Sequence, residues 1–235
     1  MINSSLRSDQ NRQYAALACL SIAIAGSTII LARSPAAPFE RYFGKIEPLA
    51  AIALVIGVGF FALWLLQTRG IFEIFRGKST LQGIVVSAIA ATAFGIVAIG
   101  GDLFIRFPEE MNVALPHALL FYPVMGYTVE VIFHALPLAL LLTGTAPLLG
   151  QAPTGRLVWV SLFLAALLEP TLQLSFEAEP ISWAGAFVWT HVFAINLAQL
   201  IVFRRYDFFS MYALRLIYYL YWHIIWGTLR LEVLF

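Results

Sequence analysis

The chain has 235 residues, of which 61% are hydrophobic, 14% are aromatic and 11% are charged, and its formal net charge is +1. These polar side chains are too few to cover a soluble globule, so the composition predicts an integral membrane protein. A nearly neutral chain without runs of like charge also lacks the basic surface that binds nucleic acid, which excludes that class of function.

The apolar residues form seven stretches, each long enough for a helix to cross a bilayer, which takes about 20 residues. They lie at 14–33, 47–68, 81–105, 115–143, 156–177, 182–203 and 209–229. Prolines in the fourth stretch invite kinks, and a separate half-length helix there would raise the count to eight. The expected fold class is therefore all-α, a polytopic bundle of seven or eight transmembrane helices.

Residues 1–13 are predicted to form a polar tail, and residues 14–235 a single transmembrane domain. The spans within 14–105 carry no ionisable side chain at mid-depth, which is typical of a scaffold, whereas the spans within 115–229 contain the polar residues. Eight Lys and Arg residues flank the spans on the side of the N-terminus, and five flank them on the other side. Because positive flanks mark the cytoplasmic side, we expect a multi-pass protein with a cytoplasmic N-terminus.

An ionisable side chain at the centre of a bilayer costs about 2.5–3.5 kcal/mol, so such residues usually face the interior of a bundle and have a partner or a role. The ionisable residues in the last four spans are Glu130, His134, Glu169, His191, Arg215 and His223. Gln173, Asn196 and Tyr219 are neutral polar neighbours that would support them. We expect Glu130, His134, Glu169 and His223 to share one interior pocket, where each can satisfy another.

Glu130 and His134 are four residues apart, so they project from one face of a helix. At this spacing a carboxylate can orient an imidazole, or both can bind one metal ion. With Glu169 and His223 they would suit zinc or iron. The same groups could instead hold only protons and water, or form a buried hydrogen bond that locks the packing of helices.

Two further features belong to the same polar set. Glu169 precedes Pro170, which removes a backbone donor, and Gln173 follows one turn later. Arg215, Tyr219 and His223 recur every four residues along one side of the last span. An unpaired arginine in a bilayer is costly, so we expect Arg215 to neutralise a carboxylate from another helix.

The sequence "VEVIFH" at 129–134 resembles the first signature of the CPBP family, the CAAX-prenyl protease and bacteriocin-processing intramembrane proteins, which is Glu-Glu-x-x-x-Arg. The order of the elements that follow, ending in "RRYDFFSMYALRLIYY", is also similar, and the resemblance covers the C-terminal half of the chain. It implies an intramembrane peptidase with a carboxylate that activates water. Here Val129 stands at the first signature glutamate and His134 at the signature arginine, while Glu130 matches the second glutamate.

Val129 cannot take a proton from water, so we expect a non-proteolytic member that acts as a subunit or partner-binding protein in the bilayer. One alternative is an active, metal-dependent intramembrane endopeptidase that cleaves a membrane-embedded peptide, with Glu130 and His134 as catalytic residues. A second alternative is a proton-coupled transporter in which the acidic residues relay protons.

Overall fold

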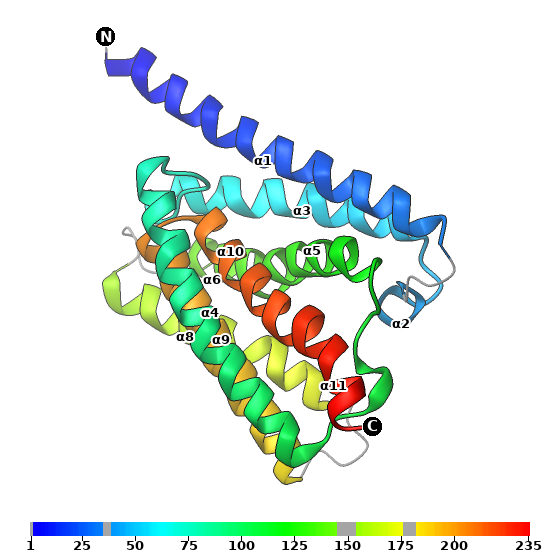
Figure 1. Ribbon diagram of the computed structural model, residues 1–235. Helices are drawn as coiled ribbons and strands as arrows, with labels where there is room; N and C mark the ends of the chain where they lie inside the picture. Colours follow the sequence, from blue (N-terminus) through cyan, green and yellow to red (C-terminus); the bar gives the residue numbers. More distant parts are fainter. Residues whose placement is uncertain (1, 35–38, 145–153, 176–181) are drawn as a thin grey trace.

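The computed structural model describes residues 2–34, 39–144, 154–175 and 182–235, and within these ranges the chain is helical and contains no strand (Figure 1). The α-helices are α1 (Ile2–Ala32), α2 (Phe39–Phe43), α3 (Pro48–Thr68), α4 (Lys78–Ile105), α5 (Ala118–Val129), α6 (Leu136–Gly144), α8 (Gly155–Ser175), α9 (Trp183–Arg205), α10 (Phe208–Tyr219) and α11 (Gly227–Val233). The shorter elements are the 3-10 turn η1 (Glu109–Met111) and two π-helical segments, η2 (Glu130–Ala135) and η3 (Leu220–Trp226).

Six helices among the described residues are long and apolar enough to cross a membrane. They are Asp9–Ala32, Pro48–Thr68, Lys78–Ile105, Ala118–Gly144, Gly155–Ser175 and Trp183–Arg205. They overlap the first six predicted spans, although most ends differ by a few residues, and the last two residues of the predicted span 156–177 lie outside the described residues. The fold is thus all-helical and compatible with a multi-pass membrane protein.

The predicted span 209–229 lies in α10, η3 and α11, which follow one another without a break. Each of the three is shorter than a bilayer-spanning helix, and only together do they reach the required length. In the same way α5, η2 and α6 form one continuous helical run, Ala118–Gly144. The described residues of this region therefore contain one long helix and no separate half-length helix. A π-helical turn interrupts each run, and such turns are frequent at functional sites.

The polar tail predicted at 1–13 is helical from Ile2 onward and belongs to α1. It contains neither glycine nor proline, so the helix of the first span can extend through it. Gln13 near its end is buried: its Oε1 accepts from the backbone N–H of Ile74 at 2.9 Å and from Gln67 at 2.8 Å. The predicted polar tail therefore continues the helix of the first span, and Gln13 at its end packs against α3 and the loop that follows α3.

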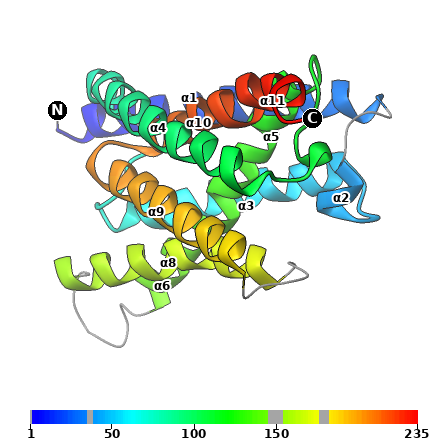
Figure 2. The ribbon, with the colours of Figure 1, turned by 60° about the horizontal axis from the view of Figure 1, so that its bottom comes forward.

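The helices pack in layers that Figure 2 shows from below. α1 lies against α3 and α5, α8 lies against α9, and α10 lies along α4. At Gly83 and Gly95 of α4, a Cβ atom would collide with Ser210 and touch Tyr221, so these glycines let α4 approach the C-terminal helices closely. Large apolar side chains such as Phe104, which is 90% exposed, cover the outside, as expected of a surface that faces lipid.

Candidate functional site

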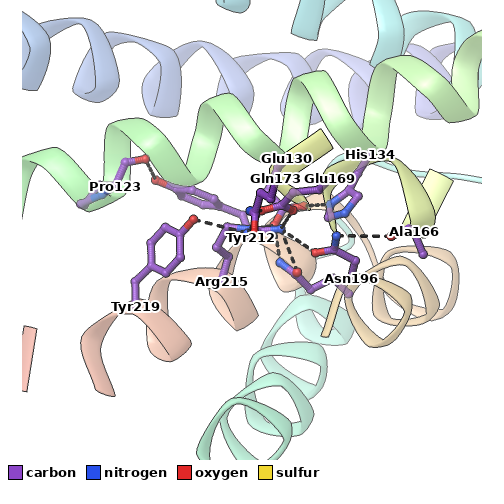
Figure 3. Close-up of polar contacts among 11 residues, drawn as sticks. Pro123, Glu130, His134, Ala166, Glu169, Gln173, Asn196, Tyr212, Arg215 and Tyr219 are labelled. Carbon is purple, nitrogen blue, oxygen red and sulfur yellow. Dashed lines mark hydrogen bonds and ion pairs between the residues drawn. The ribbon is translucent and has the colours of Figure 1, made fainter. Parts of the chain in front are cut away.

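Arg215 of α10 lies at the centre of a buried network of polar side chains (Figure 3). It is only 3% exposed. Its Nε donates to Glu130 Oε1 at 2.6 Å, and its Nη2 donates to Glu169 Oε2 at 3.1 Å. One guanidinium therefore bridges two carboxylates, and it ties α10 to η2 and to α8.

Besides a second hydrogen bond to Glu169, from Nη1 to Oε1 at 3.4 Å, this guanidinium donates to neutral side chains. Nη2 also lies 3.1 Å from Asn196 Oδ1 and 3.0 Å from Gln199 Oε1, and Nη1 lies 3.3 Å from the Tyr219 hydroxyl. The Gln199 amide donates to Glu130 Oε1 as well. Gln199 was absent from the predicted network, although its place three residues after Asn196, on the same face of α9, was a usable signal.

Glu130 and His134 are both fully buried on the π-helical segment η2. His134 Nδ1 lies 2.6 Å from Glu130 Oε2, so each oxygen of this carboxylate has a hydrogen-bond partner. His134 Nε2 has no hydrogen-bond partner in the described part of the chain. The pair is joined directly, and Glu130 alone connects it to Arg215 and Gln199.

Pro170 explains how α9 is fastened to α8 beside the network. It lies inside α8 without ending the helix, and because it has no N–H it leaves the carbonyl of Ala166 without its usual donor. The Asn196 amide reaches that carbonyl at 3.5 Å. One turn beyond Glu169, Gln173 donates to Glu169 Oε1 at 3.1 Å. Pro170 therefore leaves the Ala166 carbonyl free to accept a hydrogen bond from Asn196 of α9.

His223 does not bond to Glu130, His134 or Glu169. Its Nδ1 lies 2.7 Å from Asn112 Oδ1, and its ring stacks on Tyr122 with the centroids 4.5 Å apart. His191, the other histidine expected to support the network, contacts the Tyr218 hydroxyl at 3.2 Å.

A cavity of about 250 Å³ lies beside the network. Arg41, Arg215, Glu169 and Gln173 supply its charged and amide groups, and Tyr219 and His223 form part of its wall. The remaining lining is mostly apolar or aromatic and includes Phe107, Phe187, Val188, Ile195, Tyr218 and Trp222. A concave, mainly apolar surface with a few convergent polar groups is the usual form of a binding site.

The residues present do not fit a zinc or iron ion. In the described ranges no three His, Cys, Asp or Glu side chains come close enough to bind one metal, so Glu130, His134, Glu169 and His223 do not form the expected ligand set. The reason is that Arg215 lies between the two glutamates and already compensates their charge. A divalent cation there would have to displace a guanidinium that is hydrogen-bonded on every side.

A second buried ion pair joins Arg230 of α11 to Asp102 of α4. Arg230 donates to Asp102 from Nε at 2.7 Å and from Nη2 at 2.9 Å, and Trp226 Nε1 donates to the same carboxylate at 2.7 Å. Arg230 also donates to the carbonyls of Phe107 and Pro108. Arg230 and Asp102 are fully buried and fasten α11 to the end of α4.

Comparison with known proteins finds no protein-family model, no curated protein and no solved structure that matches this chain.

Proposed function

We propose that this chain is a CPBP-like membrane protein that does not hydrolyse peptides and instead binds a partner or ligand within the bilayer. One observation carries the proposal: Arg215 holds both Glu130 and Glu169 in ion pairs. A general base must offer a free oxygen within hydrogen-bond reach of water. Both oxygens of Glu130 are occupied, and the residue before it is the apolar Val129.

The position of the cavity supports the same proposal. Arg215 and Glu169 border it, but neither Glu130 nor His134 is among its lining residues in the described chain. Glu130 and His134, which the peptidase alternative needs as catalytic residues, are therefore separated from the cavity by the guanidinium of Arg215. The hydrogen bonds of Arg215 hold this wall of the cavity in place, and a preorganised wall favours binding because little has to be ordered when the ligand enters.

The peptidase alternative leads to a direct test. The purified protein, reconstituted into nanodiscs with fluorogenic peptides that contain a transmembrane segment, should cleave them no faster than Glu130→Gln does. If Glu130 served as the base, that substitution would reduce cleavage about 100- to 10,000-fold. Cleavage by the unmodified protein that is lost in Glu130→Gln but kept in Glu73→Gln, a change outside the network, would refute the proposal.

The proposal includes seven spans with a cytoplasmic N-terminus, in which α10, η3 and α11 cross the bilayer together. Cys19 is the one cysteine of the chain, so a Cys19→Ala background allows single cysteines to be placed at Lys78, Glu109 and Glu232. We expect a membrane-impermeant maleimide to label intact cells at Glu109→Cys and Glu232→Cys, and Lys78→Cys only after permeabilisation. If Glu232→Cys, like Lys78→Cys, were labelled only after permeabilisation, the run α10, η3 and α11 would not cross the bilayer and the protein would have six spans.

A further inference from the structure

Two polar side chains of the last helical run face the cavity from adjacent turns. Tyr219 ends α10, and His223 follows four residues later in η3. Their ring centroids are 4.9 Å apart, and both residues line the cavity. Neither belongs to an ion pair, so both can contribute hydrogen bonds to a neutral ligand.

The existing hydrogen bonds decide what each side chain offers to the cavity. Asn112 Oδ1 can only accept, so His223 Nδ1 carries the proton in their 2.7 Å hydrogen bond, and the Nε2 of a neutral imidazole is then an acceptor. Arg215 Nη1 donates to the Tyr219 hydroxyl at 3.3 Å, so this hydroxyl acts there as an acceptor and keeps its proton to donate. No hydrogen bond within the described residues uses His223 Nε2 or the Tyr219 proton. The cavity therefore presents one donor and one acceptor side by side.

We infer that this cavity binds a lipid-soluble molecule that carries an uncharged hydroxyl group. A hydroxyl oxygen can accept from Tyr219 while its proton is donated to His223 Nε2, so one ligand group satisfies both side chains. An anionic head group has no proton to donate to His223 Nε2, and an ammonium group cannot accept a hydrogen bond from Tyr219. The apolar lining, with Phe107, Trp222 and others, encloses the hydrocarbon part of the ligand.

This inference rests on the proposed function, because it assigns the cavity to a ligand that is bound and released unchanged. The two remain separable in experiments. Peptide cleavage is measured with one set of substrates, and binding of an alcohol with another. Cleavage without alcohol binding would reject both, and absence of cleavage without alcohol binding would reject only the assignment of the ligand.

The test uses a long-chain alcohol that carries a photoreactive diazirine near its hydroxyl, and the matched methyl ether of the same chain. The full-length protein is reconstituted in phosphatidylcholine nanodiscs, because that head group has no hydroxyl to compete. Cross-linked residues are mapped by mass spectrometry, and affinity is measured by competition with the unlabelled alcohol. We expect saturable labelling at cavity residues such as Met111 and Val188, and about tenfold weaker competition by the ether, since it lacks the donated proton.

Two variants make the assignment specific. Tyr219→Phe removes only the donor and should weaken binding of the alcohol about tenfold. Tyr221→Phe is the matched control, because Tyr221 lies two residues away, contacts Thr92 of α4 and does not line the cavity, so its affinity should be unchanged. Equal binding of alcohol and ether by the unmodified protein, or equal losses in the two variants, would overturn the inference. The comparison of the two ligands needs no variant and therefore holds even if Tyr219→Phe folds poorly.

Discussion

Replacing Arg215 with methionine should lower the free energy of unfolding by about 3–5 kcal/mol, because two buried carboxylates then lose their shared cation. Glu130 would keep His134 and Gln199, and Glu169 would keep Gln173, but none of these is a permanent positive charge. The measurement is equilibrium unfolding of the purified protein in mixed micelles, followed by tryptophan fluorescence.

Two companion variants identify the cause of this loss. The triple variant Arg215→Met/Glu130→Gln/Glu169→Gln removes the uncompensated charges and should recover most of the lost stability, since a buried ion pair replaced as a whole is often neutral. Arg33→Met makes the same substitution at an exposed end of α1 and should change stability by less than about 0.5 kcal/mol. A triple variant as unstable as Arg215→Met would show that Arg215 acts through packing and not through charge.

Removing Arg230 is expected to have an effect of similar size. In Arg230→Met, Asp102 stays buried and keeps only Trp226 and the Phe107 backbone N–H as hydrogen-bond donors. The carbonyls of Phe107 and Pro108 also lose the hydrogen bonds that Arg230 donates to them. We expect a loss of about 3–5 kcal/mol in the same unfolding experiment. The matched control is Arg12→Met: Arg12 pairs with Asp9 at 2.9 Å, but both side chains are at least half exposed, so the loss should be about 0–1 kcal/mol.

The double variant Asp102→Asn/Arg230→Met completes a thermodynamic cycle for this pair. Asparagine keeps an acceptor for Trp226 and removes the charge, so the double variant should be more stable than Arg230→Met alone. Additive losses of stability would mean that the two side chains do not interact, and would contradict the structure at this point.

The sequence by itself determined the class of the protein and the residues that need partners. Length and apolar character are properties of single segments, so the six described helices that are long and apolar enough to cross a membrane could be found without knowledge of their neighbours. The cost of ionisable groups in a bilayer singled out Glu130, His134, Glu169 and Arg215, and the i, i+4 spacing of Glu130 and His134 indicated a contact that the structure contains. These inferences depend only on local chain geometry and on the bilayer as a solvent.

Only the tertiary structure decided which partners meet. Arg215 and Glu130 are 85 residues apart, and Arg230 and Asp102 are 128 apart, so their pairing depends on how the helices pack and not on any local period. Packing also put the guanidinium of Arg215 where a shared metal ion was expected, brought Gln199 into the network, and turned His223 toward Asn112. A periodic pattern shows which face of a helix is polar, but it does not show which helix packs against that face. Here the neighbours are set by the close approach of α4 and α10 at Gly83, and by the hydrogen bond from Asn196 of α9 to the carbonyl of Ala166 in α8, which lacks its usual donor because of Pro170.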